Sequence, residues 1–181
     1  MSTRIQATLD DLMQTPGKAE LVNGEIVTMP PIGDAPGRAG DRIYLSLQKH
    51  EDQTGIGRAV SDNKAFRVDL PHRGSFSPDA AYYVGPRGGM SYYPQAPVFA
   101  VEVRSSGDYG PRAEESVAQK RADYFAAGTQ VVWDVDLLSE DVVRKYAASD
   151  PKHPTIFHRG QLADAEPAVP QWTMNVDELF R

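Results

Sequence analysis

The alternation of apolar and polar positions predicts a chain of short strands separated by a few helices. The clearest local pattern is a hairpin, because residues 20–22 and 25–27 flank Asn23-Gly24. This dipeptide readily supplies the positive φ that both central positions of a tight hairpin turn need. A short helix is expected before the hairpin, with Thr8 as its N-cap and Asp11 at the capping-box position.

The middle of the chain reads as a loop, a helix and then several strands. Residues 30–40 hold three Pro and three Gly and are expected to form a loop, after which a helix runs over residues 43–50. Residues 60–70 read as one extended stretch. Short strands are expected at residues 80–84 and 98–103, joined by a Gly- and Pro-rich loop.

The second half of the chain contains a strand, helix, strand order. Residues 113–127 form a helix by composition, with Gly128 as the residue that ends it, and a strand follows over residues 130–135. This order implies a crossover between parallel strands. A returning strand is expected at residues 142–146, then a Pro-rich tail up to a short helix at residues 176–180. The fold class is therefore α/β, a mixed sheet with helices packed on it.

Length and composition fit one folded domain over residues 1–181. The absence of cysteine excludes disulfides and thiolate-held zinc, so any metal would be bound by oxygen or imidazole ligands. No apolar run approaches the roughly 20 residues of a membrane span, and no signal-peptide pattern opens the chain, so we expect a cytoplasmic protein. The net charge of −6 disfavours nucleic-acid binding, although acids gathered at a metal site could supply part of it.

Two acids near the predicted strand at residues 98–103 are the leading candidates for chemistry. Glu102 ends an apolar run, where an ionised carboxylate needs a partner, and Asp79 stands before the preceding strand. Pairing of these two strands would bring both carboxylates to one edge of the sheet. Magnesium commonly uses one or two protein carboxylates, with waters and phosphates completing its shell. The simpler alternatives are a turn role for Asp79 and an ion pair of Glu102 with Arg104 or Arg67.

Two further residues join this candidate site. Lys120 lies at the edge of the apolar face of its helix, beside Tyr124, from where it could reach over the sheet edge. Its alternative is a lysine with a buried stem and a solvated ammonium. Glu20, at the start of the hairpin, is either a ligand or an ordinary solvated residue.

Other common sites are not indicated by the sequence. No pair of histidines shows metal-ligand spacing such as H-E-x-x-H. There is no P-loop, dinucleotide fingerprint or serine nucleophile elbow either. The four histidines are His50, His72, His153 and His158.

Five short motifs, each weak alone, follow one another along nearly the whole chain. They are Glu20-Leu-Val-Asn-Gly-Glu25, Ser77-Pro-Asp79, Val101-Glu102-Val-Arg-Ser105, Lys120-Arg-Ala-Asp-Tyr124-Phe-Ala-Ala-Gly128 and Val132-Trp-Asp-Val-Asp136. In this order, with these gaps, the chain resembles the large bacterial family of putative restriction endonucleases, also called domain of unknown function 820 or Uma-type proteins. The resemblance implies the PD-(D/E)XK restriction-endonuclease-like fold, a central mixed sheet flanked by helices.

The resemblance also implies a site and an activity. Asp79 and Glu102 would bind a divalent metal, usually magnesium with manganese as an option, Glu20 would be an accessory acid, and Lys120 would orient or activate the attacking water. The activity would be hydrolysis of phosphodiester bonds in DNA, and an enzyme that cuts both strands is expected to be a homodimer. The chain departs from the family in carrying Arg104 at the usual lysine position and Gly40 where many relatives have a histidine.

Two functions remain open from the sequence. The first is a magnesium-dependent endonuclease, and a local positive rim around its site is expected from the nearby basic residues. Besides Lys120 these are Arg67, Arg73, Arg87, Arg104 and Arg112. The second is a catalytically silent protein of the same fold that acts as a binding or assembly module, because a fold alone does not establish an activity.

Overall fold

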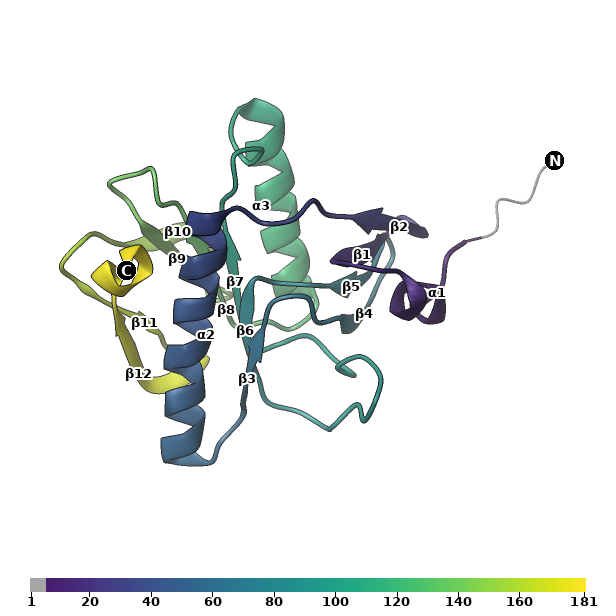
Figure 1. Ribbon diagram of the computed structural model, residues 1–181, viewed down its shortest axis with the longest axis horizontal. Helices are drawn as coiled ribbons and strands as arrows, with labels where there is room; N and C mark the ends of the chain where they lie inside the picture. The colour runs from purple at the N-terminus through teal and green to yellow at the C-terminus, as the bar shows by residue number, and fades with distance from the viewer. Residues whose placement is uncertain (1–5) are drawn as a thin grey trace.

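A mixed six-stranded sheet runs through the computed structural model, which describes residues 6–181 (Figure 1). Its strand order is β10-β9-β8-β7-β6-β3. The strands are β3 (Arg58–Ser61), β6 (Ala80–Tyr83), β7 (Phe99–Val103), β8 (Val131–Val135), β9 (Val143–Ala147) and β10 (Asp150–Phe157). β7 and β8 are parallel and the other neighbours are antiparallel, which confirms the predicted crossover and the mixed α/β class. Residues 1–5 of the expected domain lie outside the described residues.

A second, four-stranded sheet carries the N-terminal hairpin. Its order is β2-β1-β5-β4. The strands are β1 (Ala19–Val22), β2 (Glu25–Thr28), β4 (Phe66–Leu70) and β5 (Arg73–Phe76). The hairpin prediction is confirmed, since Val22 pairs with Glu25 across Asn23, whose φ is 52°, and Gly24, whose φ is 70°. β1 also pairs with β5 at Val22 and Arg73, and this contact brings the hairpin to the end of the main sheet.

Helices pack on both faces of the main sheet. They are α2 (Asp34–Thr54) and α3 (Pro111–Ala126), whereas α1 (Leu9–Gln14) packs on β1 of the second sheet. Ile43 of α2 lies in the core on one face with Val101, and Tyr124 of α3 lies in the core on the other face with Ala100. Side chains along β7 therefore alternate between the two faces, with Ala100 and Glu102 toward α3.

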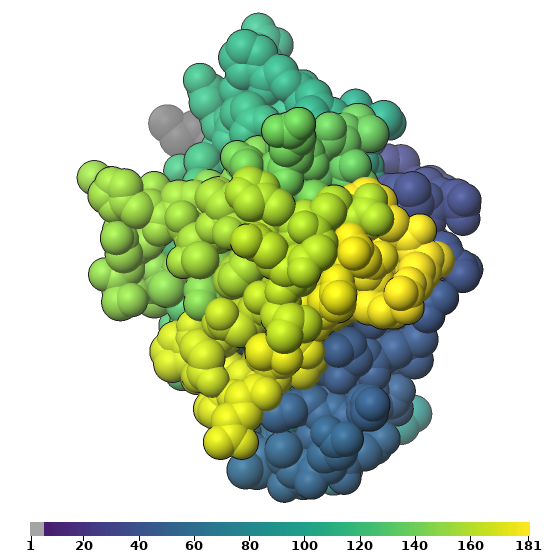
Figure 2. All heavy atoms as spheres, turned by 90° about the vertical axis from the view of Figure 1, so that its left-hand side faces the viewer, coloured from purple at the N-terminus to yellow at the C-terminus, as the bar shows by residue number. Residues whose placement is uncertain are grey.

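The C-terminal segment packs beside α2 (Figure 2). It consists of β11 (Leu162–Ala165), β12 (Val169–Asn175) and the 3-10 helix η1 (Val176–Phe180). Trp172 of β12 donates its indole N–H to Ser46 Oγ at 3.1 Å. Trp133 of β8 lies 5.2 Å from Trp172 between ring centroids and donates to the main-chain oxygen of Asp164 at 2.9 Å. These contacts join the tail to the main core.

Three of the predicted segments differ from the structure: the start of α2, the extended stretch at residues 60–70, and the tail. α2 begins at Asp34, inside the expected loop, because Pro36 falls in the first helical turn, where a missing N–H costs no internal hydrogen bond. The stretch at residues 60–70 is two strands in different sheets, separated by a turn in which Asn63 has φ 58°. The tail contains three unpredicted strands, of which β10 is an edge strand that tolerates Pro151 and Pro154.

Within residues 6–181, no helix combines the length and the apolar character needed to cross a bilayer.

Trp133 provides a test of how the core is held together. Its side chain is 1% exposed and contacts both Phe99 and Trp172. We expect Trp133→Ala to lower the free energy of unfolding by about 3–5 kcal/mol, measured by urea denaturation, because it leaves a large cavity. Leu138→Ala, at a position 84% exposed, is the control and should change it by less than about 0.5 kcal/mol. Equal effects of the two changes would contradict this account of the core.

Candidate active site

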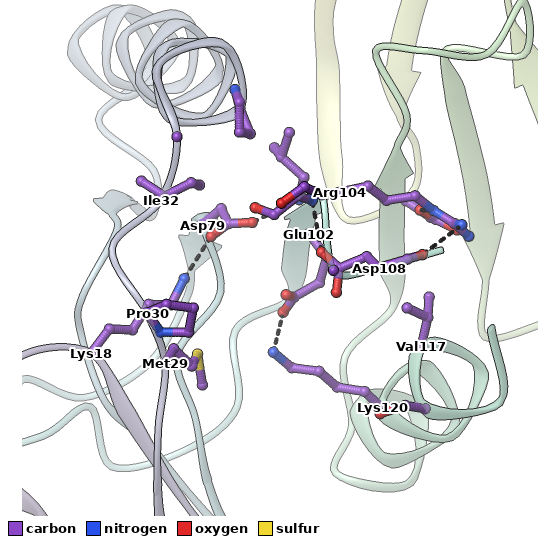
Figure 3. Close-up of a pocket in the computed structure, with 18 of the residues that line it drawn as sticks. Lys18, Met29, Pro30, Ile32, Asp79, Glu102, Arg104, Asp108, Val117 and Lys120 are labelled. Carbon is purple, nitrogen blue, oxygen red and sulfur yellow. Dashed lines mark hydrogen bonds and ion pairs between the residues drawn. The ribbon is translucent and has the colours of Figure 1, made fainter. Parts of the chain in front are cut away.

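A cavity of about 790 Å³ lies at the end of the main sheet where β6 begins and β7 ends (Figure 3). Residues 29–33, before α2, form one wall, and they include Met29, two prolines and Ile32. Residues 103–108, after β7, and one face of α3 form the other walls. Asp79, Glu102 and Lys120 all line this cavity, so the structure brings together the residues that the sequence singled out.

Asp79 is fixed by the pairing of β6 with β7. Its main-chain N–H donates to the oxygen of Val101 at 3.0 Å, and its Oδ2 accepts from the N–H of Val103 at 2.7 Å. The other oxygen, Oδ1, accepts from Lys18 Nζ at 2.5 Å. Asp79 is therefore more than a turn residue, because its carboxylate joins the ends of two strands and still faces the cavity.

Glu102 points from β7 toward α3. Its Oε1 accepts from the hydroxyl of Tyr124 at 2.6 Å and lies 2.9 Å from Lys120 Nζ. Burial raises the pKa of the Glu102 carboxyl, and the charges of Asp79 and Glu20 act in the same direction, while Lys120 opposes them. The expected ion pair with an arginine does not form, since Arg67 pairs with Asp69 and Arg104 pairs elsewhere.

Lys120 of α3 contacts an acid of β1, Glu20, and an acid of β7, Glu102. Its Nζ lies 2.9 Å from Glu20 Oε1 and 2.9 Å from Glu102 Oε1. Burial alone would lower the pKa of Lys120, but these two carboxylates raise it, so the amine stays protonated. The ammonium is thus held between carboxylates, and the alternative of a solvated ammonium does not describe it.

Glu20 is buried at 4% exposure, unlike a solvated hairpin residue. Besides Lys120, it accepts from the N–H of Ser77 at 2.8 Å and from Arg73 Nη1 at 2.6 Å. Burial opposes ionisation, but Lys120 and Arg73 together lower the pKa of Glu20. It is therefore an ionised acid that holds two cations in place.

Arg73 connects Glu20 to the far side of α3. Its Nε donates to Asp123 Oδ2 at 2.9 Å, and Asp123 Oδ1 lies 2.8 Å from His72 Nε2. The guanidinium is buried and also lies over the ring of Phe76, 4.9 Å from its centroid. Arg73 thus compensates two buried acids and ties β1 to α3.

Lys18 was missed from the sequence, and the contacts that Tyr124 and Arg73 make in the site were not predicted. Lys18 pairs with Asp79 and also with Asp62, at 2.7 Å. The sequence did contain a pattern that places Lys18 near the site. Lys18 precedes Glu20 by two residues, and residues two apart on an extended chain share a face. Tyr124, four residues after Lys120 on α3, was named only as its neighbour on the helix. The pairing of Arg73 depends on contacts between β1, β5 and α3 that no local pattern shows.

The predicted positive rim is mostly absent. Arg104 donates to Asp134 at 2.7 Å and pairs with Glu114, and these acids raise its pKa, while Arg67 and Arg73 are paired as described above. Arg87 and Arg112 are exposed. Arg121 of α3, another basic residue that lines the cavity, lies over the ring of Tyr146 at 3.7 Å from its centroid.

The acids suit a hard cation better than a zinc ion. Among residues 6–181 no group of three or more His, Cys, Asp or Glu side chains could hold a metal. Asp79 and Glu102 nevertheless offer two carboxylates from neighbouring strands to one cavity, and each already accepts from an ammonium group. Two hard oxygen donors with room for water fit magnesium, which rarely uses a cage made only of protein ligands. They do not fit the closed four-ligand shell of structural zinc.

Gly40 of α2 lies against the same site. A Cβ built there would be 3.5 Å from the main-chain oxygen of Asp79, an ordinary contact distance. Gly40, one of the two departures from the family that the resemblance implies, therefore lies next to Asp79.

Comparisons with known proteins agree with the fold. The profile of a family described as "Uma2: Putative restriction endonuclease" matches residues 7–177. A crystal structure described as a putative nuclease belonging to DUF820 from Anabaena variabilis superposes with a TM-score of 0.73. The two chains are 19% identical, and the match covers 96% of this chain and 97% of the other. No curated protein matches the sequence significantly.

The Arg73 network predicts a large effect on stability. We expect Arg73→Met to lower the free energy of unfolding by about 3–5 kcal/mol, because Glu20 and Asp123 would remain buried without this cation. Arg67→Met on the adjacent strand is the matched control. That side chain is 45% exposed and pairs at 3.5 Å, so a change within about 0.5 kcal/mol is expected in the same denaturant titration. Similar losses in both variants would refute the assigned role of Arg73.

The raised pKa of Glu102 predicts a pH-dependent effect on stability. A carboxyl whose pKa is raised by folding contributes stability below its unfolded pKa, near 4.5, and loses it as the pH rises through the folded value. Glu102→Gln cannot ionise, so from pH 4 to pH 8 its free energy of unfolding should rise relative to that of the wild type. Thermal melts with a chelator present measure this, with exposed Glu115→Gln as control. A relative decline would show that the pairing with Lys120 outweighs burial.

Proposed function

The chain belongs to the Uma2 family of putative restriction endonucleases, and we propose that it is a divalent-metal-dependent endonuclease that hydrolyses phosphodiester bonds in DNA. The observation that supports this most is the meeting of Asp79, Glu102 and Lys120 in one cavity at the junction of β6, β7 and α3. These side chains come from three separate segments of the chain. A purely structural ion pair would not require a cavity in front of it.

Asp79 and Glu102 would hold the metal, with magnesium as the proposed ion and manganese as a substitute. When bound, the metal would neutralise charge on the phosphate and lower the pKa of a water molecule. The protein prepares this position by fixing Asp79 through the N–H of Val103 and by orienting Glu102 through the hydroxyl of Tyr124. Both acids are then held with little freedom before a metal arrives.

Lys120 would act as a cation and not as a general base. Its two carboxylate partners raise its pKa, so the ammonium can donate to the attacking water or to a phosphate oxygen but does not accept a proton. Glu20 keeps this ammonium in place while Arg73 and the N–H of Ser77 hold Glu20. Glu20 is therefore a positioning acid in this proposal.

The proposed partner is DNA, and the proposed assembly follows from the number of sites. One set of these residues cuts one strand at a time, so a double-strand break would need two copies of the chain. We include a homodimer in the proposal on the strength of the family resemblance. One domain over residues 1–181 and a cytoplasmic location are included on the strength of the length and composition of the sequence.

Plasmid nicking tests the proposed function. Wild-type protein with magnesium or manganese should relax supercoiled plasmid, and Asp79→Asn or Glu102→Gln should reduce the rate by about two orders of magnitude or more. Asp69→Asn, at a side chain 88% exposed, is the control and should keep the wild-type rate. Thermal melts of each variant separate lost chemistry from lost folding.

Two outcomes would reject the proposal. Cleavage that persists in both acid variants would assign the activity to another site or to a contaminant. A folded wild-type protein with no cleavage of duplex or single-stranded DNA under either metal would instead favour a silent binding or assembly module.

A further inference from the structure

Both carboxylate oxygens of Asp79 accept a hydrogen bond in this structure. Oδ2 accepts from the main-chain N–H of Val103 and Oδ1 accepts from Lys18 Nζ, at 2.7 and 2.5 Å. The first bond continues the pairing of β6 with β7 one step beyond its paired residues and helps to hold the two strand ends together. A cation that binds Asp79 through Oδ1 would therefore compete with Lys18 for this oxygen.

Lys18 also has a second acceptor within reach. Its Nζ lies 2.7 Å from Asp62 Oδ1, in the turn after β3, while it contacts Asp79. The Lys18 side chain is only 14% exposed, and Asp62 is the more exposed of its two partners, at 33% against 8% for Asp79. A small movement of a flexible lysine toward Asp62 would free Asp79 without leaving an ammonium unpaired.

The charge of Lys18 lies in the field of both candidate ligands. Burial lowers the pKa of Lys18, but the charges of Asp79 and then Glu102 raise it, and the net shift is upward. The ammonium is thus attracted to the same pair of acids that would attract a divalent cation. Two cations this close on one oxygen would repel each other strongly in a partly buried site.

We propose that Lys18 is an internal competitor of the divalent metal, whose ammonium occupies Asp79 Oδ1 until the metal displaces it onto Asp62. This inference rests on the proposed function, since it assumes that Asp79 helps to hold a metal. The inference makes a claim that the proposed function does not make, because it assigns Lys18 and Asp62 opposite effects on metal affinity. Figure 3 shows Lys18 reaching Asp79 from the side of β1, away from Lys120, which reaches Glu102 from α3.

Calorimetric titration of the full chain with Mn²⁺ tests the competition directly, without a catalytic readout. Lys18→Met should bind Mn²⁺ about tenfold more tightly than wild type, because a competing charge is gone. Lys49→Met, an exposed lysine of α2, is the matched control and should leave the dissociation constant unchanged. If Lys18 were only a structural brace for Asp79, its loss would weaken binding instead.

Asp62 supplies the second arm of the test. Asp62→Asn should weaken Mn²⁺ binding several-fold, because the displaced ammonium loses its acceptor. In Lys18→Met/Asp62→Asn the Asp62 change should have no further effect, since no ammonium remains to be received. Additive effects would show that the two charges act only through the general field, and this would overturn the displacement.

The remaining outcomes also decide the matter. Unchanged or weaker binding by Lys18→Met, while wild type binds Mn²⁺, overturns this inference and leaves the proposed function standing. Absence of Mn²⁺ binding in wild type and in every variant overturns both. Should Lys18→Met melt far below wild type, Lys18→Gln, which keeps a polar contact to Asp79, replaces it with the same expected direction.

Discussion

The hydrogen bond from the N–H of Val103 to Asp79 Oδ2 is the constraint on which the site depends. It continues the antiparallel pairing of β6 and β7 by one step and uses a side chain in place of a main-chain carbonyl. Glu102 precedes Val103, so its side chain emerges on the opposite face of β7 from Val103, toward α3. The separation of the two acids is therefore set by strand geometry and does not rely on flexible loops.

Charge compensation is the second organising feature. Glu20, Asp79, Glu102 and Asp123 lie at one end of the fold, and each is paired with a cation that comes from another element. A buried carboxylate without a partner is very unfavourable, so these pairs hold the N-terminal hairpin, the main sheet and α3 together. The same pairs fix the positions of Asp79 and Glu102, which line the cavity. Stability and the proposed chemistry thus share one network.

Local patterns in the sequence could predict part of this network but not all of it. The period of two predicts that Ala100 and Glu102 share one face of β7, and the helical period placed Lys120 beside Tyr124. The role of Arg73 depends on the pairing of β1 with β5, and residues 60–70 gave no sign of belonging to two sheets. β10 in the tail was missed because prolines in a sequence argue against a strand. An edge strand tolerates them, since the missing N–H can face away from the neighbouring strand.

The pairing of the arginines with acids also lowers the attraction that the protein can exert on phosphate groups. Arg67, Arg73 and Arg104 all contact acids, so few of the basic residues near the cavity are free to attract phosphate at long range. Surface attraction to DNA should then be weak and readily screened by salt. In the proposed enzyme, a divalent ion between Asp79 and Glu102 would add the missing positive charge where the phosphate must lie. Substrate binding would in this way depend on the metal, and Lys18 would set how readily the metal enters.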